Sequence, residues 1–415
     1  MLKLFLGNGA FRIFLLFRAF SGIGVGIFRI FMMWAVHAQY QNPLYTGIAG
    51  FMFVAPFVAS FLAGPLVDRL NKACLLRVAC FAGFCVAALL LAVPYAGRPG
   101  VWFLHLAILV FSIADVFAGP AATALLPRIV GDDDLVKANA LVNIAGTVAG
   151  LCIGVALYVM MARGAGFGLV HGVNAAVLLA AFVFSFFLRD KGHAQAGGAE
   201  LRAYFAELAL AFAFVRRGIM RHMVIALVFV FLFAEIAYVN VPMFAELHMG
   251  TASGYILLSA LALVGGILGS FISRIAGPRL ELSKIFVAGF IAAGIARIAF
   301  VSVIATDVSR AVWIYILYAG LGSALGIFMR TLKQKLSPKD MIGRVDAITA
   351  SIASAAAAIG AILGGAAGAL LPSVDAALVI QGTSSIAIGA FLLLSRRVRM
   401  LPKINDVERL QSFSA

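Results

Sequence analysis

The sequence predicts an all-α membrane protein with twelve spanning helices in two pseudo-symmetric six-helix bundles. Of its 415 residues, 63% are hydrophobic and only 12% are charged, and the mean hydropathy is +1.07. A soluble domain is nearer half apolar and a quarter charged. Charge-poor runs of about 20 residues recur along the chain, and in hydrocarbon only helices or a closed barrel satisfy every backbone hydrogen bond. Because the runs are continuous rather than alternating, they predict helices.

The predicted spans form two groups of six around one long polar connection. They cover residues 15–36, 46–67, 75–94, 101–125, 140–161 and 167–188, and then 224–244, 254–272, 285–305, 311–329, 347–371 and 376–394. A weak internal repeat supports two halves, since a charged segment enters a Gly- and Ala-rich span at residues 126–154 and again at 332–365. The sequence therefore predicts an N-terminal bundle (1–190), a cytoplasmic linker with an amphipathic helix (191–222), a C-terminal bundle (223–396) and a cytoplasmic tail (397–415).

The distribution of Lys and Arg predicts the orientation, because short cytoplasmic loops retain cations. With the N-terminus inside, the outer connections hold only Arg98, Arg163 and Arg310. The spans hold three more, and the remaining 26 of 32 (32 − 3 − 3) are cytoplasmic. We therefore expect a multi-pass protein of the bacterial inner membrane with both termini in the cytoplasm.

The linker carries apolar residues at helical spacing between residues 201 and 212, and three arginines follow before residue 222. This pattern favours an interfacial helix beside anionic lipid. A simple tether between the halves is the alternative. We expect a monomer.

Several other classes of protein fit poorly. The net charge of +15 could suggest nucleic acid, but the cations are scattered through short connections rather than gathered on one face. The four cysteines have no metal-type spacing, and we expect free thiols, no metal and no cofactor. No HExxH, CxxC or phosphate-binding loop occurs, so an enzyme is not expected. A channel is disfavoured because there is no filter-like repeat.

The segment GPLVDRLNKACLLR, at residues 64–77, resembles the loop signature of the major facilitator superfamily. The segments ALLPRIVGDDDLVKANAL (124–141), FAELALAFAFVRRGIMRHM (205–223) and GRVDAI (343–348) resemble its drug-exporter branch, which includes macrolide efflux proteins and the enterobactin exporter. The resemblance covers most of the chain. It implies the major facilitator fold, a small-molecule substrate, alternating access and possible exchange with protons.

A conformational latch is expected in the first of these segments, formed by Gly64, Asp68, Arg69 and Arg77. Glycine permits close packing, and a carboxylate at position 68 can complement the positive N-terminus of a neighbouring helix. By resemblance, Asp68 would meet the start of the eleventh span. The alternative is that the basic residues are ordinary cytoplasmic cations.

Two departures from the exporter pattern weaken the inference of proton antiport. Leu151 occupies the place of a proline that is frequent in the fifth span of these exporters. Val25 lies near the place of an acidic residue in the first span. Proton coupling therefore needs other carboxylates.

Ionisable residues within the spans are the main candidates for a functional site, because such groups are costly in a bilayer. Asp115 and Glu235 each lie near the middle of a span, and Arg29 lies closer to the outer side of the first. By resemblance, these three spans line the central cavity. Glu235 is the first choice for a proton-coupling carboxyl and Asp115 the second. The alternative is a static ion pair such as Arg29 with Asp115; Arg297 is expected to be structural.

The substrate cavity is expected to include these three charged residues together with four aromatic ones: Tyr238, Trp34, Tyr315 and Tyr318. Glu235, Tyr238 and Pro242 are predicted to share a helical face. Glycines recur every fourth residue at 146, 150 and 154 and at 360, 364 and 368, and such stripes permit close helix packing.

The function expected from the sequence is secondary active transport, most simply proton-coupled export of a hydrophobic or amphipathic drug or siderophore. A lipid or lysophospholipid flippase is the alternative, because LVKANAL (135–141) also resembles that relative.

Overall fold

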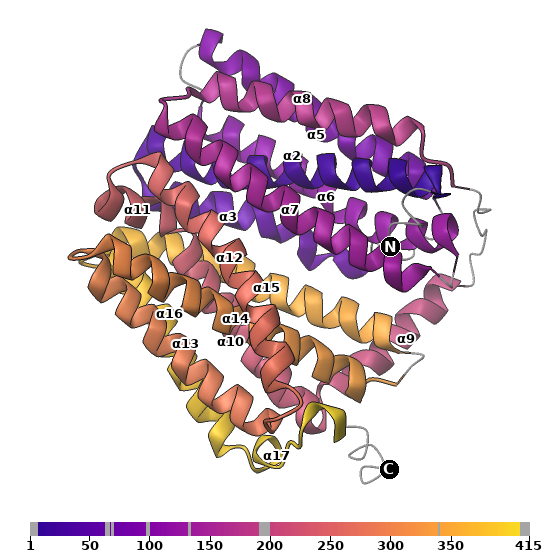
Figure 1. The fold of residues 1–415 in the computed structure, drawn as a ribbon, viewed down its shortest axis with the longest axis vertical. Helices are drawn as coiled ribbons and strands as arrows, with labels where there is room; N and C mark the ends of the chain where they lie inside the picture. The colour runs from indigo at the N-terminus through magenta and orange to yellow at the C-terminus, as the bar shows by residue number, and fades with distance from the viewer. Residues whose placement is uncertain are drawn as a thin grey trace. The chain divides into compact units, whose positions relative to one another are not determined.

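The computed structural model describes residues 7–62, 67, 70–96, 100–131, 134–190, 200–338 and 341–406, and these residues form an assembly of helices (Figure 1). Within this part of the chain, twelve helices are long and apolar enough to cross a membrane. They are α2 (Gly9–Tyr40), α3 (Pro43–Val58, continued by the 3-10 turn η1, Ser60–Leu62), α5 (Lys72–Ala96), α6 (Val101–Val130), α7 (Leu135–Ala162), α8 (Phe167–Phe186), α10 (Gly218–Tyr238), α12 (Ala252–Ala276), α13 (Leu282–Ile304), α14 (Val308–Leu336), α15 (Ile342–Leu370) and α16 (Val374–Leu394). The prediction of twelve spans is confirmed.

Side-chain caps fix the start of several of these helices. Asn8 accepts a hydrogen bond from the N–H of Phe11 at 3.0 Å, and Ser373 accepts one from Asp375 at 3.0 Å. Asp307 caps α14 in the same way through the N–H of Arg310, and this bond, with that from Ser309, holds the pKa of its carboxyl below the ordinary value. Such caps satisfy N–H groups that a helix leaves without a partner in its first turn.

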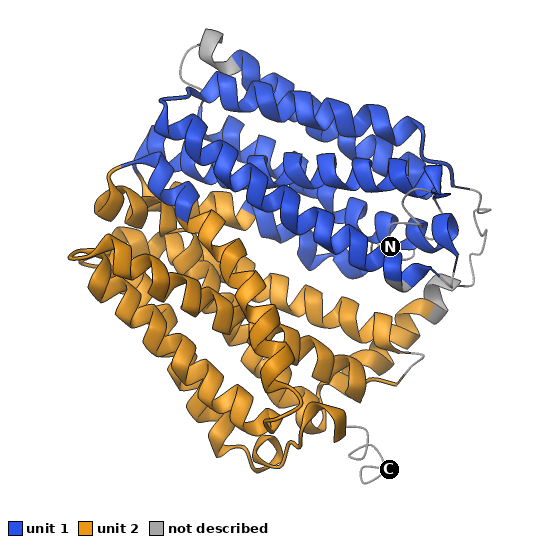
Figure 2. Ribbon diagram, viewed as in Figure 1, with its two compact units in different colours: residues 1–41, 52–201, 251–257 blue, residues 42–51, 202–250, 258–415 orange. Residues whose placement is uncertain are grey.

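The helices cluster into two compact units (Figure 2). Unit 1 comprises residues 1–41, 52–201 and 251–257, and unit 2 comprises residues 42–51, 202–250 and 258–415. The change of unit at residues 201–202 falls inside the predicted linker. Two helices are divided between the units. The first part of α3 belongs to unit 2 and its remainder to unit 1, whereas the first part of α12 belongs to unit 1 and its remainder to unit 2.

Each unit has its own apolar core. In unit 1, Phe11, Phe14 and Phe17 of α2 are almost wholly buried with Leu76 and Leu125. In unit 2, a second core joins α13, α14 and α16 around residues that include Phe286, Phe290, Phe328 and Leu392. The two cores position the helices on which the polar groups below are carried.

The seventh predicted span differs from the structure. It was expected to run over residues 224–244, but α10 begins at Gly218 and ends at Tyr238, and a separate helix, α11 (Val241–Met249), follows. Pro242 has no N–H to donate to the preceding turn, and Asn240 bonds to Ala237 three residues back. The predicted face of Glu235, Tyr238 and Pro242 therefore crosses a break between two helices, because Pro242 belongs to the second helix.

The predicted linker helix is present as α9 (Glu200–Val215). Leu208, Ala211 and Val215 are buried on one side, whereas Phe205, Leu210 and Phe212 are exposed. Glu207 on this helix forms an ion pair of 2.7 Å with Arg344 at the start of α15. The helix is thus tied to unit 2, and its exposed apolar side chains are of the kind that enter a lipid interface. The chain ends with two short elements, α17 (Arg396–Arg399) and η2 (Ile404–Asp406).

Candidate functional site

A large cavity lies within unit 2, with a volume of about 1090 Å³. Its walls come from α10, α14 and α15, and it reaches α13 and α16 between them. Apolar side chains dominate the lining on α10 and α13, among them Met220, Met223, Leu227, Val230, Phe231 and Phe290. The polar lining includes Tyr318, Ser323, Arg330, Thr331, Lys333, Gln334, Asp346, Thr349, Gln381, Ser384 and Ser385. An apolar cavity with a few convergent polar groups is the usual form of a small-molecule site.

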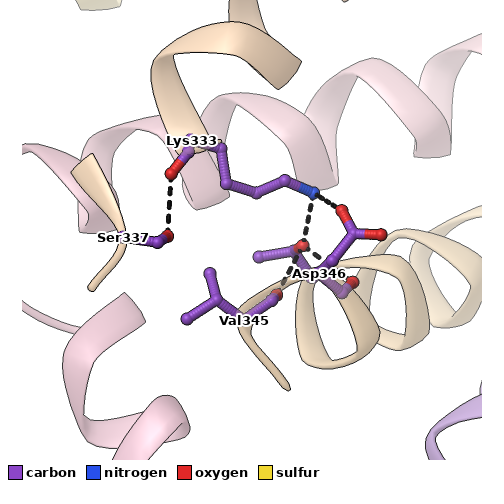
Figure 3. A network of polar contacts seen from close by, with 5 residues as sticks. Lys333, Ser337, Val345 and Asp346 are labelled. Atoms are coloured by element: carbon purple, nitrogen blue, oxygen red, sulfur yellow. Dashed lines mark hydrogen bonds and ion pairs between the residues drawn. The ribbon is translucent and has the colours of Figure 1, made fainter. Parts of the chain in front are cut away.

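A polar network lies at one end of this cavity, where α14 ends and α15 begins, and Figure 3 shows its side chains. The Lys333 ammonium donates to the carboxylate of Asp346 and, at 2.9 Å, to the hydroxyl of Thr349. Thr349 in turn donates to the carbonyl of Val345 at 2.8 Å, and Ser337 donates to the carbonyl of Lys333 at 2.7 Å. The negative charge of Asp346 is therefore already matched by Lys333.

The other end of the cavity is formed by a tyrosine and glutamine pair. Gln381 of α16 donates from its amide to the hydroxyl of Tyr318 of α14 at 2.7 Å. Behind the pair lies Arg297 of α13, which is 3% exposed and whose guanidinium stands 4.8 Å from the centroid of the Tyr318 ring and 5.6 Å from that of Phe300. Tyr315 interacts electrostatically with Arg297 and lies against Tyr318, with 5.9 Å between the ring centroids.

Of the predicted cavity residues, Tyr318 lines this cavity, and Tyr315 lies just behind it. Glu235 and Tyr238 belong to the same unit but lie outside the lining. A Cβ added at Gly50 would stand 3.6 Å from a carboxylate oxygen of Glu235, which places this carboxyl against the part of α3 that unit 2 contains. Its assignment to proton coupling stays a prediction.

The remaining predicted residues lie in unit 1. Asp115 of α6 is half-buried and interacts electrostatically with both Arg29 and Arg18 of α2. Arg29 is exposed, with its guanidinium 5.7 Å from the centroid of the Phe53 ring. Trp34 stacks on Tyr255 with 6.2 Å between centroids. The structure thus places Asp115 within electrostatic range of both Arg29 and Arg18, and the static ion pair of Arg29 with Asp115 stays a prediction.

Only part of the predicted latch can be placed. Gly64, Asp68 and Arg69 lie outside the described residues. Arg77 is half-buried on α5, and its guanidinium stands 4.5 Å from the centroid of the Phe186 ring of α8. Arg77 therefore packs between α5 and α8. Asp190 connects the same two helices.

Asp190 is a buried anchor that the sequence reasoning missed, because it precedes a segment that reads as flexible linker. Its carboxylate is 1% exposed, forms an ion pair of 2.6 Å with Arg128 at the end of α6, and accepts from the N–H of Lys72 at 2.9 Å. One side chain thus joins the start of α5 to the ends of α6 and α8. In the sequence, the one indication of this role is an acidic residue at the end of a predicted span.

Replacing Asp190 with Ala is expected to destabilise the protein by about 1–2 kcal/mol, because Arg128 is 35% exposed and the ion pair is therefore only partly buried. The loss includes the cap of α5, which alone contributes about 1 kcal/mol. Thermal unfolding of purified protein in lipid nanodiscs measures the effect. Asp134→Ala is the matched control, because its ion pair with Lys137 is exposed and such pairs contribute little. Equal unfolding midpoints for the two variants would contradict the assignment.

The fold and the cavity define a multi-pass membrane protein built like a small-molecule transporter. The family model of the Major Facilitator Superfamily matches residues 14–361, and the chain belongs to this superfamily. A search of curated proteins found no match.

Solved structures with the same fold are distant in sequence. A nucleoside transporter, NupG, is 14% identical, with a TM-score of 0.67 over 93% of this chain and 98% of that one. A D-xylose-proton symporter is 12% identical, with a TM-score of 0.68 over 95% and 98%. A peptide transporter, POT, in complex with sulfate is 12% identical, with a TM-score of 0.73 over 95% and 96%. These similarities establish the fold of a major facilitator transporter.

Proposed function

We propose that the protein is a proton-coupled secondary transporter that exports an amphipathic small molecule by alternating access. The cavity within unit 2 is the observation that supports this proposal. It has room for a drug-sized molecule, its wall on α10 and α13 is apolar, and its polar groups lie on α14, α15 and α16. A hydrophilic solute such as a sugar would leave that apolar wall without a partner.

The energy for transport must come from a gradient or from a partner, because the sequence contains no nucleotide-binding loop. Glu235 and Asp115 are the proposed coupling groups. A carboxyl group within the membrane can take a proton on one side and release it on the other when access alternates. Two further parts of the proposal rest on the sequence. The outward direction of transport rests on the exporter-like segments, and the cytoplasmic position of both termini rests on the distribution of Lys and Arg.

The proposal predicts the behaviour of two charge-removing variants. In proteoliposomes with an imposed pH gradient, Glu235→Gln is expected to lower proton-driven accumulation of an amphipathic probe at least tenfold, and Asp115→Asn several-fold. Both should retain exchange of the probe between the two sides without a gradient, because exchange needs alternation but no net proton movement. Full proton-driven accumulation by both variants would overturn the coupling assignment.

The same assay separates transport of a drug-like amphiphile from lipid movement. Vesicles that contain a labelled lysophospholipid report movement of that lipid between leaflets. Movement of the lysolipid without movement of any soluble amphiphile would replace export with the flippase alternative.

A further inference from the structure

We propose that the unit 2 cavity selects amphipathic organic anions, with Arg297 as the positioning residue behind Tyr318 and Arg330 as the attracting charge in the lining. The proposal rests on the proposed transport function for its substrate class. The ligand would carry a carboxylate, sulfate or phosphate group on an apolar body. No motif in the sequence points to this preference, which follows from the distribution of charge around the cavity.

The charges of the cavity lining do not balance. Among the residues of the lining that the structure describes, two are basic, Arg330 and Lys333, and one is acidic, Asp346. Lys333 already binds Asp346, so these two cancel. Among the described residues, Arg330 has no ion-pair or hydrogen-bond partner, and its side chain is exposed at the cavity. The formal charge of these described lining residues is therefore +1 (2 − 1), and the uncompensated charge lies on Arg330.

A second uncompensated cation lies behind the opposite end. Arg297 is almost wholly buried, no carboxylate in the described part of the chain lies within ion-pair distance of it, and its Nε has no hydrogen-bond partner. It is held instead by the rings of Tyr318 and Phe300 and by Tyr315. An arginine buried in a membrane span without an acidic partner is costly, and such residues mark sites of function. The expectation that Arg297 is only structural does not account for this cost.

Tyr318 is the contact through which Arg297 reaches the cavity. One face of its ring meets the guanidinium, its hydroxyl accepts from Gln381, and both Tyr318 and Gln381 line the cavity. The tyrosine hydroxyl therefore still has its own hydrogen to donate. An anionic head group beside this hydroxyl would receive a hydrogen bond and would lie near a positive charge in a medium of low dielectric constant, where electrostatic attraction is strong.

The dimensions of the cavity suit an amphiphile. Tyr318 and Arg330 are twelve residues apart on α14, which at 1.5 Å per residue is about 18 Å along the helix. Between them the wall is apolar, with Leu227, Val230 and Phe290 among its members. Among the described lining residues, a cationic ligand would meet the unpaired Arg330 and no unpaired carboxylate, and it would also approach Arg297 behind Tyr318, so the site disfavours it.

The test measures binding of three probes that differ only in head group: octyl sulfate, octyltrimethylammonium and octyl glucoside. The four cysteines are replaced by Ala, and the protein is embedded in nanodiscs. A fluorescent thiol label at Gly326→Cys then reports occupancy of the cavity by the probe. Gly326 lines the cavity and has open space at its Cβ position. The same label at Gly119→Cys in unit 1, where the space is also open, reports partition into the bilayer.

Octyl sulfate is expected to bind the Gly326 reporter at least tenfold more tightly than octyltrimethylammonium, with no matching change at Gly119. Arg297→Met and Arg330→Gln should each reduce this preference several-fold, whereas Arg297→Lys, which keeps the charge, should retain most of it. Because Arg330 is exposed, its variant keeps the test valid if Arg297→Met does not fold.

Equal or reversed preference in the parent chain, or an equal response at both reporters, would overturn the proposal. Binding is measured without any gradient, so its outcome is independent of transport. Selective binding of octyl sulfate without transport of any amphiphile would refute the proposed function alone. Transport of a cationic amphiphile without anion preference would refute this inference alone.

Discussion

Gly360→Ala is expected to impair both folding and transport, although it adds a single methyl group. A Cβ at Gly360 would overlap the backbone carbonyl of Leu232 in α10, and one at Gly364 would stand 2.8 Å from the carbonyl oxygen of Ile236. These contacts are with backbone, so the two helices must separate. Overpacking of this kind typically costs about 1–3 kcal/mol. Because α10 and α15 both line the cavity, their separation would also change its shape.

Gly146→Ala is the matched control for this prediction. Gly146 lies in the other predicted glycine stripe, on α7, yet nothing stands within 4 Å of the position its Cβ would take. Alanine favours helix by about 1 kcal/mol over glycine, so this variant should keep or slightly raise the unfolding midpoint. Thermal unfolding in nanodiscs and initial transport rates measure both variants. A similar fall for the two would contradict the close packing of α10 and α15.

Gly322→Trp is expected to lower the initial rate of transport at least tenfold while the protein still folds. Gly322 lines the cavity, and its Cβ position is open, so a large side chain can enter the space without displacing backbone. An indole there would occupy the volume that the proposed ligand needs and would cover its polar contacts. Gly322→Ala should transport nearly as well as the parent chain.

Ile295→Trp serves as the control for bulk alone, since Ile295 is 57% exposed on α13 and lies outside the cavity lining. Folding is followed by the unfolding midpoint and by monodisperse elution in detergent. Full transport by a folded Gly322→Trp protein would show that the unit 2 cavity is not on the substrate path.

The sequence predicted the helices well because each apolar run is long enough to span hydrocarbon and is bounded by charged loops. The break after Tyr238 was missed because helical spacing predicted one continuous face through Pro242, whereas α10 ends at Tyr238 and α11 begins at Val241. The amphipathic helix α9 was predicted from its own periodicity. Its ion pair with Arg344 could not be predicted, because it depends on the tertiary contact between α9 and the start of α15.

The candidate site was less predictable, because helical periodicity says which residues share a face and not what that face meets. Tyr318 was predicted as a substrate contact and lines the cavity. Lys333 was counted only among the cytoplasmic cations and Asp346 only as part of the GRVDAI segment, although the fold of α14 and α15 brings them together. The two glycine stripes look equivalent in the sequence, yet Gly360 is packed against backbone and Gly146 is open. Tertiary contacts decide each of these cases.

Accumulation of an amphipathic probe in proteoliposomes under an imposed pH gradient tests the central claim most directly. With the purified parent protein, the probe is expected to concentrate against its own gradient, to change direction when the pH gradient is reversed, and to equilibrate when a protonophore removes that gradient. Equilibration of the probe that is insensitive to the sign and size of the pH gradient would contradict proton-coupled transport.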